Sequence, residues 1–241
     1  MIESLLLAVT GVTTRLGGQD LTNATGFFFE RGERLFLVTA AHVVLDAARG
    51  HEPDGLLIEL HVDPDDVART THFLIPLYRD GRPAWRQTTD PGGAVDVVAI
   101  ELDRHALPPT VVLQAFTPAH MLQQLDEIEI GTAVLIVGFP LGFHDTLHRL
   151  PVARQAVIAS AFGMRFQGHG YFLTDARTHR GTSGAPVVVR AAGASDRVQL
   201  AWRLLGIHAM RLDMSHRDVV EDGHLDLNCA WYADVLLPLT E

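Results

Sequence analysis

The chain has few cysteines and few basic residues. Cys229 is its single cysteine, and its 241 residues include 19 Lys and Arg against 29 Asp and Glu. One cysteine excludes an internal disulfide framework and is compatible with a reducing compartment. The formal net charge of −10 at pH 7 argues against a surface that neutralises phosphates or anionic lipids. We therefore expect neither a nucleic-acid partner nor a membrane partner.

Long apolar runs are also absent. No segment reaches the roughly 18 uninterrupted apolar residues that cross a bilayer. The apolar start MIESLLLAVTGV carries Glu3 where a secretory signal has positive charge, so we expect a cytoplasmic protein. His144 and His148 have the spacing of metal ligands, but they lie in a loop-like stretch without a third Cys or acidic ligand. No metal and no other cofactor is expected.

Short apolar runs, in contrast, recur along the whole sequence. They have the length of strands, are rich in β-branched and aromatic residues, and are separated mostly by Gly, Pro, Asp or Asn. The runs are GFFFE, RLFLVTA, LLIELHV, VDVVAIEL, AVLIVGF, QAVIAS, YFLT, APVVVR, VQLAWRLLGI and NCAWYA. This pattern predicts an all-β protein, and the length suits one large β domain or two of about 120 residues each.

Helix is expected in only three segments, residues 40–50, 117–128 and 233–239. The polar, proline-containing segment from Leu107 to Ile130 divides the strands into two groups and is the candidate linker. Residues 63–93, with DPDD, RDGRP and DPGG, have the composition of loops.

The stretch RGTSGAPVVV, residues 180–189, sets Ser183 between small residues at the start of an apolar run. Glycines allow backbone conformations closed to other residues and let another molecule approach closely. Taken alone, the stretch favours a β-turn that happens to contain serine. A serine nucleophile needs companions elsewhere in the chain.

Two further motifs supply them. LFLVTAAHVV places His42 where a strand gives way to a helical turn, and GGAVDVVAIEL places Asp96 at the head of an apolar strand. His42 alone is also compatible with a capping or core histidine. A carboxylate that enters a buried strand must be paired, because burying it unpaired is costly. The order His42, Asp96, Ser183 predicts a catalytic triad in which Asp96 orients the imidazole, His42 takes the hydroxyl proton and Ser183 attacks a carbonyl.

The blocks TAAHV, DVVAIEL and GTSGAPV resemble the three signature blocks of chymotrypsin-fold serine peptidases, particularly the bacterial trypsin-like and HtrA-type branch. AVLIVGFPLGF, LLGIHA and CAWYADVLLPL are similar to later strands and the closing turn of that branch. The resemblance covers nearly the whole chain, so we expect no HtrA-type peptide-binding module after Glu241. It implies two six-stranded antiparallel β-barrels with the active site between them, followed by a short C-terminal helical turn. Residues 1–115 would form the barrel that carries His42 and Asp96, and residues 116–241 the barrel that carries Ser183.

The resemblance further implies an oxyanion hole formed by the amides of Gly181 and Ser183. Thr182 stands where digestive proteases have an aspartate that pairs with a newly cut N-terminus, so that activation switch is not expected. Ala185 replaces a glycine found in most relatives, a small change that leaves catalysis plausible.

Glutamate-cutting members of the family resemble this chain at Thr178 and His208. The implied specificity pocket comprises Arg177, Thr178, His208, Ala209 and Met210. An imidazolium beside a hydroxyl binds a carboxylate through charge-assisted hydrogen bonds, which favours Glu, or Gln or Asp, on the acyl side of the scissile bond. A satisfied strand histidine at position 208 and a solvated Arg177 are the alternatives, and Met210 departs from the aromatic residue that relatives often carry.

We therefore expect a bacterial serine endopeptidase that cleaves protein or peptide substrates through an acyl-enzyme, and a regulatory protein partner is compatible with it. One alternative is a non-catalytic trypsin-like scaffold that binds a protein partner, and another is an esterase. The combined presence of His42, Asp96, Gly181 and Ser183 argues against the scaffold, because a chain freed from catalysis has no chemical reason to keep all four.

Overall fold

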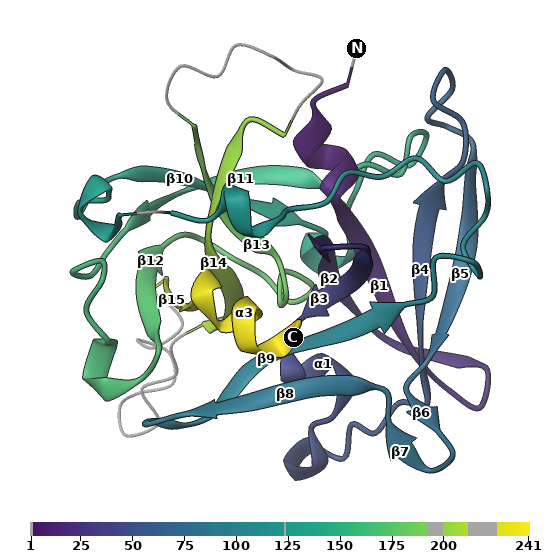
Figure 1. The fold of residues 1–241 in the computed structure, drawn as a ribbon, viewed down its shortest axis with the longest axis horizontal. Helices are drawn as coiled ribbons and strands as arrows, with labels where there is room; N and C mark the ends of the chain where they lie inside the picture. Colours follow the sequence, from purple (N-terminus) through teal and green to yellow (C-terminus); the bar gives the residue numbers. More distant parts are fainter. Residues whose placement is uncertain (1, 123, 192–199, 212–225) are drawn as a thin grey trace.

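The computed structural model describes residues 2–122, 124–191, 200–211 and 226–241 (Figure 1). These residues form mostly antiparallel strands with short helical turns between them. Among the described residues, no helix has both the length and the apolar character needed to cross a membrane.

The N-terminal half forms one seven-stranded sheet in the order β5-β4-β1-β2-β3-β9-β8. Its strands are β1 Val9–Leu16, β2 Gln19–Arg31, β3 Arg34–Thr39, β4 Gly55–His61, β5 Thr70–Pro76, β8 Trp85–Asp90 and β9 Gly93–Leu102. Tight turns join neighbouring strands, as at Gly32 between β2 and β3, where a φ of +62° suits glycine. A small hairpin separates β5 from β8 and consists of β6 Tyr78–Arg79 and β7 Arg82–Pro83.

The C-terminal half forms a closed barrel in the order β10-β11-β12-β15-β14-β13. Its strands are β10 Ala133–Gly138, β11 Val152–Ile158, β12 Tyr171–Asp175, β13 Pro186–Arg190, β14 Trp202–Arg211 and β15 Leu227–Tyr232. The chain then turns through the 3-10 turn Ala233–Val235 into α3, Leu236–Leu239. Figure 1 shows this yellow segment lying beside β9 of the first sheet.

One buried hydrophobic cluster contains residues of both units. Phe27 and Phe116 are fully buried and meet edge to face, with 5.6 Å between ring centroids. Phe29 lies opposite Phe36 in the register of β2 and β3. The same hydrophobic cluster includes Ile207 of the C-terminal barrel, so one continuous core lies under both units.

The predicted all-β fold is confirmed. The C-terminal strands form the expected closed six-stranded barrel. The N-terminal strands form a sheet of seven, and the described residues record no strand pair that closes it. The predicted linker, residues 107–130, lies between the end of β9 at Leu102 and the start of β10 at Ala133. The division of the chain at residue 115 stays a prediction.

Two local predictions are wrong. The segment 63–93 is not only loop, because β5 to β8 occupy much of it. The segment 117–128 contains no α-helix among its described residues, only the 3-10 turns Pro118–His120 and Leu125–Glu127. Met121 interrupts the helical conformation because its extended backbone forms a β-bridge with Leu204.

Candidate active site

His42 and Asp96 come together because their strands are neighbours. β3 pairs with β9 up to Thr39 opposite Val98, and His42 lies in the short helix α1, Ala41–Val44, directly after β3. The backbone amide of His42 donates to Asp96 Oδ1 at 3.0 Å, and His42 Nδ1 lies 2.8 Å from Asp96 Oδ2. A carboxylate is an acceptor, so Nδ1 carries the proton and Nε2 is left to accept one.

The turn around Ser183 requires its glycines. Gly181 has a φ of +92° and Gly184 a φ of +87°, a region that favours glycine. A Cβ at Gly181 would lie 2.5 Å from the Phe139 carbonyl oxygen, and one at Gly184 would lie 2.2 Å from the Thr25 carbonyl oxygen. The absence of a side chain at Gly181 and Gly184 therefore allows this turn to pack closely on the segments that contain Phe139 and Thr25.

The backbone amides of this turn fall into two groups. Thr182 donates its amide to the His179 carbonyl at 3.2 Å, and Gly184 donates to the His208 carbonyl at 2.8 Å. Within the part of the chain that the structure describes, no acceptor is recorded for the amides of Gly181 and Ser183. These are the two amides that the family resemblance implies for an oxyanion hole, and both are available to a bound oxygen.

Ser183 and His42 line the same cleft, which has a volume of about 490 Å³. Its described lining consists of His42, Arg49, Thr178, His179, Arg180, Ser183, His208 and Met210. No hydrogen bond between Ser183 Oγ and His42 Nε2 is recorded among the described residues. In unliganded sites such contacts are often long and tighten only when substrate binds.

Thr178 and His208 lie deep in the cleft, with exposed fractions of 3% and 2%. The Thr178 hydroxyl donates to Asn228 Oδ1. Asn228 Nδ2 in turn donates to the carbonyls of Ala176 at 2.7 Å and Asp226 at 2.9 Å. Asn228 was not identified from sequence, because only the neighbouring strands of the folded barrel bring it beside Thr178.

Arg177 and Ala209, also predicted for this pocket, do not reach the cleft. Arg177 is exposed, whereas its neighbours Ala176 and Thr178 are buried. Ala209 is fully buried in the core. Ala209 lies outside the cleft because successive side chains of a strand point to opposite faces. Its neighbours in β14, His208 and Met210, line the cleft.

Sequence reasoning missed three basic or titratable residues of the lining, Arg49, His179 and Arg180. Their positions in the sequence could have identified them. His179 and Arg180 immediately precede Gly181, and Arg49 ends the turn that follows His42. With them the described lining carries several basic groups and no Asp or Glu.

The single cysteine is buried, as expected for a small apolar residue, with 5% of it exposed. Burial raises the pKa of the Cys229 thiol to about 11, an effect that a hydrogen bond with Tyr171 reduces and the nearby Asp96 carboxylate increases. The thiol is therefore protonated near neutral pH and is a poor nucleophile.

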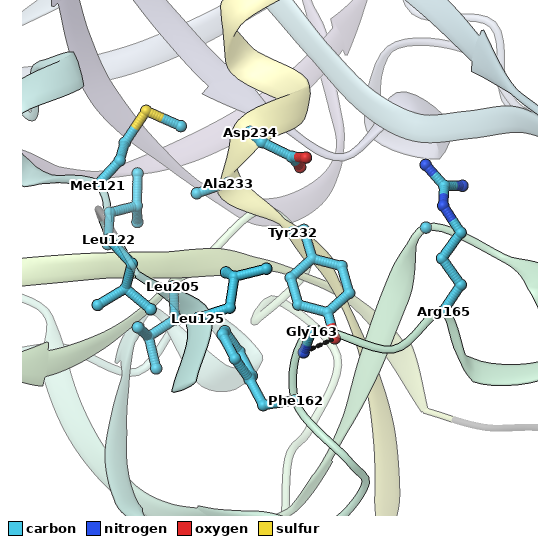
Figure 2. Close-up of a pocket in the computed structure, with 12 residues that line it drawn as sticks. Met121, Leu122, Leu125, Phe162, Gly163, Arg165, Leu205, Tyr232, Ala233 and Asp234 are labelled. Atoms are coloured by element: carbon cyan, nitrogen blue, oxygen red, sulfur yellow. Dashed lines mark hydrogen bonds between the residues drawn. The ribbon is translucent and has the colours of Figure 1, made fainter. Parts of the chain in front are cut away.

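A second cavity, of about 260 Å³, shares no described lining residue with the cleft (Figure 2). Figure 2 shows Leu122, Leu125 and Phe162 around it, and the Tyr232 hydroxyl accepts the Gly163 amide at 2.8 Å. Its described lining contains no Ser, His or Cys, so the chemistry of a serine nucleophile belongs to the first cleft. Among the described residues, no group of three or more His, Cys, Asp or Glu side chains is arranged to hold a metal ion.

Residues 24–194 match the family model of the trypsin-like peptidase domain. The match covers well over half of the chain and includes His42, Asp96 and Ser183. The chain belongs to this family.

Several solved structures have a similar fold. An HtrA-type protease with a tripeptide gives a TM-score of 0.56 at 17% identity, covering 98% of this chain and 59% of that one. The serine endoprotease from Yersinia pestis gives 0.55 at 15% identity, covering 98% and 62%. An inactive form of Rv3671c from M. tuberculosis gives 0.50 at 16% identity, covering 98% and 86%.

This chain thus spans about three fifths of the length of the first two proteins. At such identities the likeness shows the fold. No curated protein sequence matches the chain significantly.

Proposed function

We propose that this chain is a serine endopeptidase that hydrolyses peptide bonds through an acyl-enzyme. The observation that carries the proposal is the contact of 2.8 Å between His42 Nδ1 and Asp96 Oδ2, in a cleft that His42 shares with Ser183. Membership of the trypsin-like peptidase domain family supports it.

In this mechanism Ser183 Oγ attacks the scissile carbonyl carbon while His42 Nε2 takes its proton. The carbonyl oxygen becomes an oxyanion that accepts hydrogen bonds from the amides of Gly181 and Ser183, each typically worth about 2.7 to 4 kcal/mol in the transition state. His42 then protonates the leaving amine, which departs and leaves an ester on Ser183. A water molecule, deprotonated by His42, attacks that ester, and the proton returns to Ser183 as the acid product leaves.

The proposed preference is for glutamate on the acyl side of the scissile bond. The charge of the cleft supports it, because Arg49 and Arg180 line it without a described acidic side chain, although the whole chain carries a net charge of −10. Charged groups of one sign in a cleft concentrate ligands of the other sign.

Thr178 sets a limit on this preference. Its hydroxyl proton goes to Asn228 Oδ1, so a substrate carboxylate gains a hydrogen bond from Thr178 only by displacing Asn228. A glutamine side chain, in contrast, can donate its amide proton to the Thr178 oxygen. Glutamine is therefore the competing side chain at this position.

A peptide library tests the proposal, with the Ser183→Ala variant of the same chain as control. Cleavage after Glu that the variant lacks is the expected result. Cleavage after Gln would support the peptidase proposal but replace the proposed preference for Glu with one for Gln. Cleavage after Lys, Arg or small aliphatic residues would overturn the proposed preference for an acidic side chain. Equal cleavage by the variant, or none by either chain, would overturn the peptidase.

The two alternatives give different results with the same protein. An esterase reacts with a fluorophosphonate and hydrolyses esters but leaves the peptide library intact. A binding scaffold does neither. The cytoplasmic location and a regulatory protein partner stay predictions from sequence.

A further inference from the structure

Thr25 connects the N-terminal sheet to the turn that carries Ser183. It lies in β2, is completely buried, and its backbone amide donates to the Ser183 carbonyl at 2.9 Å. Its hydroxyl donates to the Gly181 carbonyl at 2.7 Å and accepts the amide of Phe139 at 3.0 Å. Its own carbonyl accepts the Thr39 hydroxyl at 2.8 Å. One residue therefore joins two segments of the C-terminal barrel to two strands of the other sheet.

We propose that Thr25 is a positioning residue of the oxyanion hole, an inference that rests on the proposed peptidase function. The Thr25 hydroxyl would hold the peptide units around Gly181 so that the Gly181 amide stays directed at the substrate oxygen. Thr25 itself takes no part in bond making or breaking.

The hydrogen bonds on both sides of Gly181 support this role. The carbonyl of Gly181 itself, which belongs to the peptide unit after its Cα, accepts the Thr25 hydroxyl. The carbonyl that precedes it, that of Arg180, accepts the amide of Leu141. A peptide unit is planar with its N–H opposite its C=O, so fixing the Arg180 carbonyl also fixes the direction of the Gly181 N–H.

The Thr25 hydroxyl contributes to both of these hydrogen bonds, to the Gly181 carbonyl directly and to the Arg180 carbonyl through the segment that contains Phe139 and Leu141. Phe139 lies two residues before Leu141, and its amide is the donor that the Thr25 oxygen accepts. Losing the hydroxyl therefore frees the Gly181 carbonyl directly and loosens the segment that holds the Arg180 carbonyl. Gly181 has the φ freedom of glycine, so its peptide units rotate more easily once the first of these contacts is lost and the second is weakened.

The surrounding sequence keeps space for Thr25. A Cβ at Gly138 would lie 2.6 Å from the Thr25 hydroxyl oxygen, and one at Gly184 would lie 2.2 Å from the Thr25 carbonyl oxygen. The two glycines allow three segments to approach one buried threonine. The hydroxyl is also hard to replace, because its removal leaves a buried carbonyl and a buried amide without their partner.

The experiment compares Thr25→Val, which removes the hydroxyl and keeps the shape, with Thr25→Ser, which restores the hydroxyl. Thr10→Val is the matched control, since Thr10 is also buried and its hydroxyl donates to a carbonyl, that of Glu59, at 2.9 Å outside the cleft. If Thr25→Val does not fold, the pair Thr25→Ala and Thr25→Ser gives the same comparison.

Two readouts separate this proposal from the peptidase proposal. Hydrogen exchange needs no activity: Thr25→Val is expected to speed exchange in peptides covering 139–142 and 180–185, and Thr10→Val is not. For peptide cleavage, kcat is expected to fall about 10- to 100-fold with KM nearly unchanged, less than the 10²- to 10³-fold loss typical of removing an oxyanion donor. Thr25→Ser should keep most of the kcat that Thr25→Val loses.

The role of Thr25 would be overturned by unchanged hydrogen exchange in both segments, or by a kcat of Thr25→Val equal to that of Thr10→Val. The peptidase proposal would still stand in that case if the unaltered chain shows cleavage that depends on Ser183. Absence of cleavage by the unaltered chain would overturn the peptidase, and with it the role of Thr25 in positioning an oxyanion hole, even if the exchange result shows that Thr25 orders the turn.

Discussion

His42 hydrogen-bonds the Asp96 carboxylate through two of its own atoms, the backbone amide at 3.0 Å and Nδ1 at 2.8 Å. Together they fix both the position of the short helix and the orientation of the imidazole. The carboxylate accepts from Nδ1, so the tautomer with a free Nε2 is the one held in the cleft that Ser183 also lines.

Asp96→Asn should lower kcat by about 10⁴-fold, as the equivalent change does in trypsin, because the amide favours the wrong histidine tautomer. Steady-state kinetics on a cleaved peptide measures this. Asp63→Asn is the control, since Asp63 also accepts backbone hydrogen bonds but lies in a loop outside the cleft. Similar kinetics for the two variants would remove Asp96 from the mechanism.

Ser183→Ala and His42→Ala should each reduce kcat by several orders of magnitude, about 10⁶-fold for the corresponding residues of subtilisin. The double variant should lose little more than either single one, because the two residues act as a unit. Single-turnover assays at high enzyme concentration can follow rates this slow. Additive losses would mean that the two side chains act in separate steps, contrary to the proposed mechanism.

His208→Ala should lower the ratio of kcat/KM for Glu over Gln peptides by about 10- to 100-fold, the effect of losing a hydrogen bond to a charged group. Matched peptides that differ only at this residue measure the ratio. Arg177→Ala is the matched control, because Arg177 adjoins Thr178 in sequence but is exposed and outside the cleft lining. A ratio that follows Arg177 instead of His208 would refute the assignment.

Cys229 should resist alkylation in the folded chain near pH 8, since burial raises the pKa of its thiol to about 11. The unfolded chain releases this proton first, so the thiol stabilises the fold below about pH 9 and this contribution is lost as the pH rises toward 11. The loss is at most about 1.4 kcal/mol per pH unit. Urea unfolding at pH 8 and 10 should show a smaller fall for Cys229→Ala. An equal fall in both chains would show that the buried thiol does not contribute.

The parts of the site that the sequence could predict are those that lie within a motif. His42, Asp96 and Ser183 each stand at the end or head of an apolar run, where local pattern is informative. Thr25 and Asn228 could not be found this way, because their partners lie 156 and 50 residues away in sequence. The alternation of apolar and polar residues indicates which face of a strand a side chain occupies. Only the tertiary packing determines which residues that side chain contacts.

The seven-stranded first sheet illustrates the same limit. Residues 63–93 are rich in Asp, Gly, Pro and Arg, a composition that favours loops. They nevertheless form strands, since β5 pairs along the whole of β4 and β8 pairs with β9. Pairing with an existing sheet thus overrides weak local preference.

The most direct test of the central claim is to treat the native chain with a fluorophosphonate and to locate the adduct by mass spectrometry of its peptides. The predicted result is a single adduct on Ser183, absent after Ser183→Ala, strongly reduced after His42→Ala, and accompanied by loss of peptide cleavage in proportion to labelling. An unlabelled chain that still cleaves peptides, or an adduct on another residue that accompanies the loss of cleavage, would contradict it.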